Sequence, residues 1–516
     1  MKNEKPDTQV LRSVVHIHYL IILLGIIGCS RKKTEVAWQQ SFYQIGSQSS
    51  PKAADLNADG ILDIVIGAGK EELAPTEQGI LALNGKNGDL LWQQAADASI
   101  VGSAVFYDIN GDGVKDVFIG GRNHSLKALD GKSGDLIWEY SYHHENDPVL
   151  QYARFNFYNS VLVPDQNHDG FQDLLTVNGG NWNALPNDTS ERHPAVLMLF
   201  DSRNGKIIAA DTMPDSHESY MSPLCFAHAG NENIQLIFGT GGETMGGSLY
   251  LATLDDLIKG QLYKAKAIAT EEQHGFIAPP VLTDITEDGY TDIIAISHAG
   301  TASAIDGKSL EPIWETKFSQ MESSNSFAVG YFNEDNIPDF FTMLSKGKWP
   351  DYSTASQVLL DGRDGVIIYQ NNIGCFNLST PVAYDIDNDG YDEAILSVND
   401  YDCDIELTED IRSPKSIRMR LIALDFQDRK EHIIDQAPSF KNIYSTPWLG
   451  DLDMDGFLDI VYTQYFNPND LFRFMGMSVK RISTGIRMQG SPRWGEYMGT
   501  QSKSQFPTKK QYSLIE

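Results

Sequence analysis

The amino-acid sequence predicts an all-β protein, an eight-bladed β-propeller with calcium loops in most blades; a seven-bladed ring is the alternative. Three observations support this fold class. Acidic loops followed by a short apolar strand recur along most of the chain, a strand with an Asp-Gly turn lies downstream of many of them, and no long helical periodicity competes. Each unit then holds about four strands, and such units at a period of about 55 residues are typical of a propeller.

The acidic loop is clearest in the stretch DINGDGVKDVFIGG, which runs from Asp108 to Gly121. Related loops begin at Asp55, Asp165, Asp284, Asp385 and Asp451, with a weaker copy at Tyr331. The gap between Asp165 and Asp284 is close to two periods long. A degenerate copy, AHAGNENIQLIFG from Ala227, fits the same register there, with Asn231 at loop position five. This copy brings the expected number of repeats to eight.

The second motif is a hairpin that ends in tryptophan. GILALNGKNGDLLW ends at Trp92, SLKALDGKSGDLIW at Trp138 and TASAIDGKSLEPIW at Trp314. Asn-Gly and Asp-Gly pairs between alternating apolar residues are strong hairpin signals. One unit is therefore expected to run as strand, acidic loop, strand, connection, strand, Asp-Gly turn and a last strand.

These motifs resemble two families of propellers. The acidic loops resemble the FG-GAP (VCBS) repeats of integrin α-chain propellers and their bacterial relatives. The ALDGKSGDLIW turns resemble the tryptophan-docking repeats of quinoprotein-like propellers, which have eight blades. The segment PRWGEYMGTQ, residues 492–501, resembles a tryptophan segment at the edge of quinoprotein-like propellers. That resemblance implies that the segment helps to close the ring beside the N-terminal blade, and that Trp38 completes the last blade.

The loop that begins at Asp108 has the donors of a calcium site. Its positions 1, 3, 5 and 9 carry Asp108, Asn110, Asp112 and Asp116. Gly at position six tolerates the positive φ of a sharp turn, so these oxygens can converge on one centre. Hard oxygen ligands in this number suit Ca²⁺ better than Mg²⁺. Position 12 is Ile119 instead of the Glu of an EF-hand, so we expect structural ions rather than a calcium switch.

The same positions in the other loops predict further ligands. They are Asp55, Asn57, Asp59 and Asp63; Asp165, Asn167, Asp169 and Asp173; Asp284, Asp288 and Asp292; Asp385, Asp387, Asp389 and Glu393; and Asp451, Asp453, Asp455 and Asp459. The Asp284 loop has Thr286 at position three and is expected to bind more weakly. The loop with Asn333, Asp335 and Asp339 lacks an acid at position one, so tight binding is not expected there. The alternative is that all of these loops are Asx-turns without metal.

The N-terminus has the features of a targeting segment. Basic residues precede the apolar run VVHIHYLIILLGIIG, which is too short for a comfortable membrane span. The run ends in IIGC at Cys29 and resembles a bacterial lipobox, which implies cleavage before Cys29 and lipidation of its thiol. An uncleaved signal anchor is the alternative. The expected domains are a signal peptide (1–28), a tether (29–37), the propeller (38–503) and a tail (504–516), on the periplasmic side or outer surface of the bacterial cell envelope.

Charge and cysteine content exclude some classes of function. The formal net charge is −30, from 70 acidic and 40 basic residues, which argues against a nucleic-acid partner. No Cys-X-X-Cys or Cys/His spacing indicates zinc. The cysteines are interpreted as buried free thiols, and a disulfide between Cys375 and Cys403 in an oxidising compartment is the alternative.

Long connections carry the candidate binding residues. Four of them, over 178–195, 239–250, 345–356 and 399–416, follow the same strand of their blades and are therefore expected to crowd one face of the ring. Their aromatic and acidic candidates for partner binding are Trp182, Glu243, Trp349, Tyr352 and Tyr401. Aromatic side chains can stack on sugars or anchor a protein. Additional charge comes from Arg192, His193, Lys348 and Arg412. Packing of these loops on one another is the alternative.

The sequence thus predicts a membrane-anchored propeller that binds a protein or a glycan, or acts as a scaffold. One alternative is a carbohydrate-active enzyme, since some polysaccharide lyases are calcium-containing eight-bladed propellers. Another is an assembly factor resembling the propeller lipoprotein of outer-membrane protein insertion machinery. A cationic residue that converges with His or Tyr in one pocket would favour the lyase. No catalytic motif is recognised, and the chain lacks the adjacent cysteines of many quinoprotein dehydrogenases, so a quinone cofactor is not expected.

Overall fold

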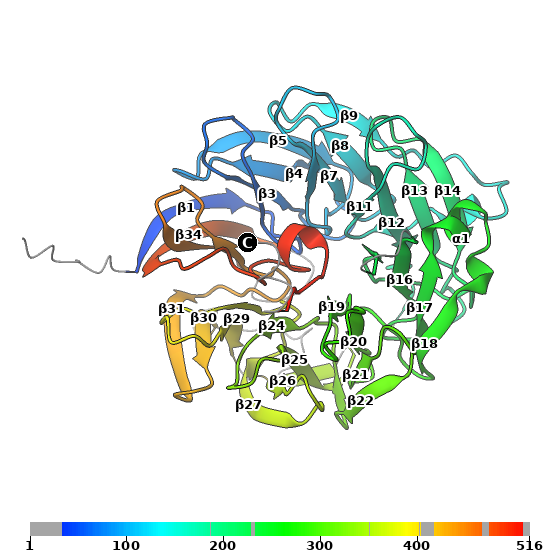
Figure 1. Ribbon diagram of the computed structural model, residues 1–516. Coiled ribbons are helices and arrows are strands. Elements are labelled where there is room, and N and C mark those ends of the chain that lie inside the picture. The colour runs from blue at the N-terminus through cyan, green and yellow to red at the C-terminus, as the bar shows by residue number, and fades with distance from the viewer. Residues whose placement is uncertain are drawn as a thin grey trace, which may run out of the picture.

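The computed structural model describes residues 34–185, 187–228, 233–349, 351–401, 403, 417–466 and 474–508. In this part of the chain the strands form eight antiparallel sheets arranged as a ring, which confirms the predicted eight-bladed propeller (Figure 1). The degenerate copy at Ala227 is a complete blade, although its residues 229–232 lie outside the described part. Among the described residues, no helix is long and apolar enough to cross a membrane.

The blades follow one another along the chain. The first four blades contain β2 (Lys52–Ala54), β3 (Asp63–Gly67), β4 (Thr76–Leu83) and β5 (Leu90–Ala96); β6 (Val105–Tyr107), β7 (Asp116–Gly120), β8 (Leu126–Leu129) and β9 (Leu136–Glu139); β10 (Asn156–Phe157), β11 (Val161–Val163), β12 (Asp173–Gly179), β13 (Val196–Phe200) and β14 (Ile207–Thr212); and β15 (Leu224–Phe226), β16 (Gln235–Gly239), β17 (Gly247–Thr253) and β18 (Lys266–Glu271). Short helices lie between some strands: η1 (Leu150–Tyr152), α1 (Leu254–Ile258) and η2 (Leu262–Lys264).

The last four blades contain β19 (Val281–Thr283), β20 (Asp292–Ile296), β21 (Thr301–Ile305) and β22 (Pro312–Lys317); β23 (Met321–Glu322), β24 (Ala328–Gly330), β25 (Asp339–Lys348), β26 (Asp351–Leu360) and β27 (Ile367–Cys375); β28 (Val382–Tyr384), β29 (Glu393–Asp400), β30 (Arg418–Asp425) and β31 (Lys430–Pro438); and β32 (Trp448–Gly450), β33 (Phe457–Phe466), β34 (Gly476–Arg487) and β1 (Glu35–Tyr43). A further turn, η4 (Thr500–Ser502), follows β34. The connection expected over 345–356 is thus a β-hairpin extension of β25 and β26.

The two faces of the ring carry different loops. Each acidic loop joins the innermost strand of a blade to the next, and each Asp-Gly turn joins the third strand to the outermost. In an antiparallel blade these two connections lie at the same end. In the first blade, Asp63 of the acidic loop accepts a hydrogen bond from the N–H of Gly85 in the Asp-Gly turn at 3.0 Å. The remaining connections, including the long ones, must therefore lie on the opposite face.

The ring is closed by its N-terminal strand. β1 pairs antiparallel with β34 and completes the eighth blade, as the family resemblance implies for Trp38 (Figure 1). The indole N–H of Trp38 donates to the carbonyl of Gly85 in the first blade at 2.7 Å. Closure therefore joins residues that are more than 400 positions apart in the sequence.

Tryptophans on outermost strands fasten neighbouring blades. The indole N–H donates to the turn of the next blade in four places: Trp38 to Gly85, Trp92 to Gly131, Trp138 to Ser202 and Trp314 to Gly362. A glycine of the turn packs against the indole ring of each of these tryptophans. Gly134, at φ +76°, would place a Cβ 2.6 Å from Cδ2 of Trp92, so a larger side chain would clash. The Asp-Gly turns thus serve contacts between blades as well as reversing the chain.

The segment after β34 crosses the centre of the ring, where Figure 1 shows it in red. The carbonyls of Trp494, Gly495 and Ser504 accept hydrogen bonds from the N–H groups of Ala383, Leu449 and Leu282, on the innermost strands of three blades. Lys52 of a fourth blade donates to the carbonyl of Tyr497 at 2.7 Å. The contacts of this C-terminal crossing segment (residues 493–506) therefore extend well beyond the N-terminal blade that the sequence resemblance implies.

One disulfide is formed within the described residues. Cys375, at the end of β27, is bonded to Cys403, and their Cα atoms are 5.2 Å apart. The interpretation of these two cysteines as free thiols is therefore wrong. The bond ties the connection that follows β29 to the sixth blade, whereas Cys225 is free and half-buried.

Candidate functional site

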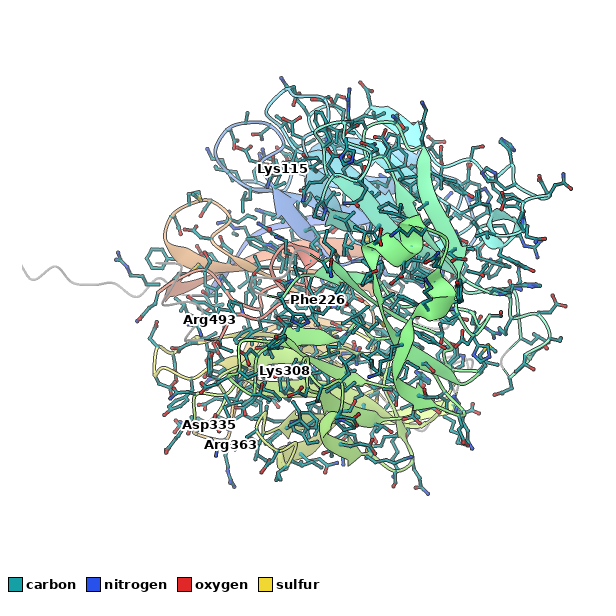
Figure 2. All side chains as sticks on the ribbon, turned by 45° about the vertical axis from the view of Figure 1, so that its right-hand side comes forward. Lys115, Phe226, Lys308, Asp335, Arg363 and Arg493 are labelled. Atoms are coloured by element: carbon teal, nitrogen blue, oxygen red, sulfur yellow. A yellow bond between two sulfur atoms is a disulfide. The ribbon has the colours of Figure 1, made fainter. Side chains whose placement is uncertain are left out.

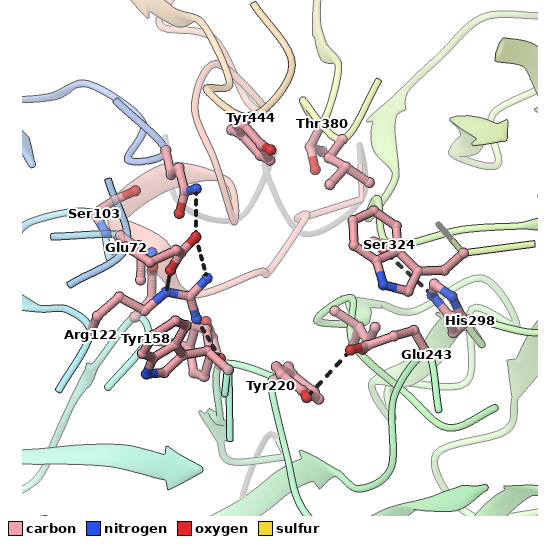
Figure 3. A pocket seen from close by; sticks show the side chains of 18 of the residues that line it. Glu72, Ser103, Arg122, Tyr158, Tyr220, Glu243, His298, Ser324, Thr380 and Tyr444 are labelled. Atoms are coloured by element: carbon pink, nitrogen blue, oxygen red, sulfur yellow. Dashed lines mark hydrogen bonds and ion pairs between the residues drawn. The ribbon is translucent and has the colours of Figure 1, made fainter. Parts of the chain in front are cut away.

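A cavity of about 530 Å³ lies at the centre of the ring, on the face with the long connections. Residues from connections around the whole ring line it, and Figure 3 shows Glu72 and Arg122 across the opening from His298 and Ser324. Four of the five predicted partner-binding residues are among them: Trp182, Glu243, Trp349 and Tyr352. Tyr401 does not line the cavity. The lining of the cavity is partly aromatic and also includes Tyr158, Tyr220, Tyr444 and Tyr497.

The charged residues predicted beside them are divided between several places. Arg192 lines the cavity, whereas the His193 ring stacks on Phe155 at 5.5 Å. Lys348 lines a second hollow of about 370 Å³. Arg412 and the lipidation candidate Cys29 lie outside the described residues.

One wall of the cavity is built around Arg122. Its guanidinium forms an ion pair with Glu72 and donates to the hydroxyl of Tyr158 at 3.3 Å. Burial by itself would lower the pKa of Arg122, but the charge and hydrogen bond of Glu72, together with the neighbouring tyrosines, outweigh it and raise that pKa. The cation is therefore fixed in place and already neutralised by a carboxylate (Figure 3).

A second wall is built around Arg192. Its guanidinium donates to both carboxylate oxygens of Glu218 at 3.3 Å and to the hydroxyl of Tyr220 at 2.6 Å. Glu243 lies 3.7 Å away and faces the cavity. Glu218 is completely buried, and burial raises its pKa to about 7 against the opposing effect of Arg192. The network orients Tyr220 and Glu243 toward the cavity.

Glu218 is expected to make stability depend on pH. Its folded pKa lies above the unfolded value of about 4.3, so its contribution is greatest below about pH 4 and is lost as the pH rises to about 7. The free energy of unfolding of the wild type, relative to Glu218→Gln, is expected to fall by about 3 kcal/mol over this range. Denaturant unfolding at a series of pH values measures it, with Glu334→Gln at an exposed site as control. Parallel curves for the wild type and Glu218→Gln would contradict the assignment.

Two histidines and a glutamate lie between the cavity and the second hollow: His298 lines the cavity, whereas His274 and Glu322 line the second hollow. Nε2 of His298 lies 3.2 Å from one carboxylate oxygen of Glu322, and Nε2 of His274 lies 3.5 Å from the other. The hydroxyl of Tyr352 and the backbone N–H of Trp349 donate to Glu322 at 2.6 and 2.9 Å. Burial acts to raise the pKa of Glu322, but these hydrogen bonds and the neighbouring imidazole lower it to about 2.

The predicted calcium loops lie on the opposite face and share one local structure. In the Asp108 loop, the N–H of Gly113 donates to the carboxylate at position one at 3.0 Å. Asp116 at position nine accepts from the N–H groups of Ile109 and Gly131, at 2.9 and 3.1 Å, and so joins the loop to the Asp-Gly turn. Position nine therefore has a structural role in the blade whether or not an ion is bound.

Two of the predicted loops gather their acids into clusters that fit a cation. In the described part of the chain, carboxylate oxygens lie within 4.8 Å of one another in the sets Asp385, Asp387 and Glu393, and Asp451, Asp453 and Asp459. Burial raises the pKa of Glu393 to about 9, and the neighbouring carboxylates of its loop add to this effect. In the Asp165 loop, the buried Oδ1 of Asp173 has no hydrogen-bond partner. These oxygens suit Ca²⁺, which takes six to eight oxygen ligands.

Side-chain cations accompany four of the described loops, and in two of them the contact is long: Arg203 lies 3.7 Å from Asp169 and Lys308 lies 3.9 Å from Asp288. Arg481 lies 2.5 Å from Asp453 and 2.8 Å from Asp459, so a guanidinium already offsets part of the charge of that cluster. Arg363 pairs with Asp335 at 2.7 Å in the loop that lacks an acid at position one (Figure 2). This last contact offers a physical reason why that loop need not bind calcium.

Several residues of the cavity were missed by sequence reasoning. Arg122, Asn181 and His298 lie two positions beyond the second strands β7, β12 and β20 of their blades, where the chain turns toward the axis. A polar residue at that repeat position was the available signal. Glu322 and His274 lie in connections between blades and carry no motif, so only the folded ring brings them together.

Comparison with known families identifies the chain's relatives. The family model described as the FAM234A/B beta-propeller matches residues 70–383, more than half of the chain, so the protein belongs to this family. No curated protein sequence matches the chain.

Solved structures share the fold at low sequence identity. A europium-containing methanol dehydrogenase superposes with a TM-score of 0.55 at 10% identity, over 87% of this chain and 93% of that one. The quinohemoprotein alcohol dehydrogenase from Comamonas testosteroni gives 0.53 at 11% identity, over 89% and 77%. The exotype rhamnogalacturonan lyase YesX gives 0.52 at 12% identity, over 89% and 75%. These likenesses agree with the resemblance to quinoprotein-like propellers and concern the fold alone.

Proposed function

We propose that this FAM234A/B-type propeller is a glycan-binding protein of the bacterial cell envelope, and that its central cavity holds the glycan. The observation that carries the proposal is the cavity itself. Its volume of about 530 Å³ falls within the usual range of small-molecule sites. Trp182, Trp349 and several tyrosines supply flat apolar faces, while Glu243 and His298 supply hydrogen-bonding groups at the wall.

The chemistry of the wall favours a neutral sugar over an acidic one. Aromatic faces pack against the C–H faces of a sugar ring, and fixed polar groups exchange hydrogen bonds with its hydroxyls. The two arginines of the cavity are already paired with carboxylates, Arg122 with Glu72 and Arg192 with Glu218. A uronate would have to compete with these carboxylates, whereas a neutral sugar would not.

Alanine substitutions at Trp182 and Trp349 are expected to weaken glycan binding at least tenfold, because each removes an aromatic face worth about 1–3 kcal/mol. A glycan array identifies the ligand, and titration calorimetry with that glycan measures the loss. Tyr263→Ala is the matched control, since Tyr263 is 70% exposed and does not line the cavity. Equal affinity in all variants, or capture of a protein partner with no glycan bound on the array, would contradict the proposal.

A lyase is the second candidate, and one specific observation favours it. Arg122, Arg192, His298 and five tyrosines line one cavity, which is the combination of cationic and proton-transfer groups that such an enzyme needs. Incubation with acidic polysaccharides tests it. Absorbance from unsaturated uronate products would establish the lyase, and an intact polysaccharide would leave binding as the function.

Localisation in the envelope follows from the N-terminal sequence. The lipobox-like IIGC motif supports cleavage before Cys29 and a lipid anchor on its thiol. Mass spectrometry of the mature N-terminal peptide measures this directly: a diacylglyceryl group on Cys29 is expected, and an unmodified Cys29 within an intact apolar segment would indicate a signal anchor instead.

A further inference from the structure

We propose that His274, His298 and Glu322 form a binding site for a divalent transition-metal ion of the Zn²⁺ class, between the central cavity and the second hollow. The three residues come from two connections and a strand: His274 lies between β18 and β19, His298 follows β20, and Glu322 is on β23. Their ligand atoms lie within 4.8 Å of one another. The proposal does not rest on glycan binding, although His298 also lines the central cavity.

The distances match the coordination sphere of a small cation. Glu322 lies 3.2 Å from Nε2 of His298 and 3.5 Å from Nε2 of His274. Tetrahedral zinc has bonds of about 2.0–2.1 Å, which place neighbouring ligand atoms about 3.3 Å apart. The two contacts are to different oxygens of Glu322, so an ion held by one of them and by both Nε2 atoms would draw these ligand atoms, which lie within 4.8 Å of one another, closer together.

The hydrogen bonds of the histidines leave the correct nitrogens for binding. Nδ1 of His274 lies 2.8 Å from the carbonyl oxygen of Glu243, which can only accept, so Nδ1 carries the proton. In the neutral ring, Nε2 then presents its lone pair toward Glu322. Nδ1 of His298 lies 3.2 Å from the hydroxyl of Ser324, which can donate or accept, and its Nε2 faces Glu322 and lies 3.3 Å from the hydroxyl of Tyr352. Contacts of this kind orient the histidine ligands of metal sites.

The carboxylate of Glu322 is already oriented by its hydrogen bonds and would be the third ligand. Glu322 is 5% exposed at its side chain, and the hydroxyl of Tyr352 and the N–H of Trp349 fix its orientation. With Nδ1 protonated, neutral His274 turns the lone pair of Nε2 toward the buried carboxylate, so this contact needs either a cation or a proton on Nε2. The competing interpretation is a pair of protonated His–Glu contacts, and metal binding distinguishes the two.

The donor set separates this site from the acidic loops. Imidazole with carboxylate suits Zn²⁺ and neighbouring first-row ions, whereas Ca²⁺ prefers oxygen ligands alone. Three protein ligands leave a fourth position open on zinc, as in catalytic sites. His274 and Glu322 line the second hollow, and His298 lines the central cavity, so that position can face a water or a ligand group.

Titration of the full-length protein with Co²⁺ tests the proposal. The protein is first treated with a chelator and then saturated with Ca²⁺, so that the acidic loops are occupied. We expect one equivalent of Co²⁺ to bind with visible absorption bands of four- or five-coordinate cobalt, and stoichiometric Zn²⁺ to abolish them. His274→Gln and Glu322→Gln are expected to weaken binding at least 100-fold. His432→Gln is the matched control, because His432 is on the outer strand β31, where it lies 4.0 Å from Asp425 of β30.

The outcome is decided by the wild type and the variants together. Circular dichroism confirms folding, and His274→Gln is the variant of choice because its side chain is 17% exposed and its loss disturbs the core least. Failure of the wild type to bind one equivalent of Co²⁺ would overturn the proposal. Equal binding by the wild type and His274→Gln would overturn it too, since the ion would then lie elsewhere.

Discussion

Removal of calcium with EGTA is expected to lower the melting temperature of this protein by about 10 °C or more. An ion present at 100 times its dissociation constant contributes about 2.7 kcal/mol to the folded state. Five near-complete loops would together contribute on the order of 10 kcal/mol, which corresponds to about 10 °C for a propeller of this size. Differential scanning calorimetry with and without added Ca²⁺ measures the shift.

The physical reason lies in the buried carboxylates of the loops. Glu393 has a pKa raised to about 9 by burial, and Oδ1 of Asp173 is buried without a hydrogen-bond partner. Bound Ca²⁺ would supply positive charge to the first and a ligand bond to the second. Without the ion, the folded state must either protonate these groups or retain buried charge.

Loop variants make the calcium prediction specific. Replacing both Asp108 and Asp112 by alanine is expected to remove one Ca²⁺ per chain, as counted by elemental analysis. Asp335→Ala is the control, because its loop lacks an acid at position one and Asp335 already pairs with Arg363. An unchanged melting temperature in EGTA, together with protein free of calcium, would show that the loops are Asx-turns without metal.

Trp138→Ala is expected to reduce the free energy of unfolding by about 3–5 kcal/mol, the range for loss of a large buried aromatic side chain. Trp138 is 7% exposed and stacks on Phe200 of the next blade, with ring centroids 6.3 Å apart. Its indole N–H also donates to the carbonyl of Ser202 at 2.7 Å. The substitution thus opens a cavity and leaves a buried acceptor without its partner.

Two further substitutions show which contact matters. Trp138→Phe keeps much of the packing and loses the hydrogen bond, so a smaller loss of about 1 kcal/mol is expected. Trp182→Ala is the matched control, since Trp182 is half-buried at the central cavity. Denaturant midpoints compare the three variants. If Trp138→Ala cost no more than Trp182→Ala, tryptophan docking would not be what holds adjacent blades together.

The fold was predictable because its signals are local and repeated. Each acidic loop and each Asp-Gly turn can be recognised within a window of about ten residues. Even the degenerate copy at Ala227 kept the strand pattern of a blade. Trp182 and Trp349 could be predicted because they lie in long connections that follow the same strand. The predicted calcium ligands remain a prediction, although two of the loops gather their acids as the interpretation requires.

The chemistry of the cavity was harder to predict because it depends on pairs of residues that are far apart in the sequence. His274, His298 and Glu322 stand in short connections with no motif, and their spacing in the sequence carries no metal signature. Arg122 lies 50 positions from Glu72, and only the curvature of the ring brings the two together. The disulfide between Cys375 and Cys403 was not the favoured interpretation for the same reason.

The C-terminal crossing segment makes closure of the ring depend on residues that are synthesised late. Residues 494–504 must be synthesised before they can accept the hydrogen bonds donated by Lys52, Leu282, Ala383 and Leu449. Likewise, β1 has no strand partner until β34 has been made. A chain that stops before this point holds an open arc of blades with exposed inner edges. Such a fragment would be more open to proteolysis than the closed ring.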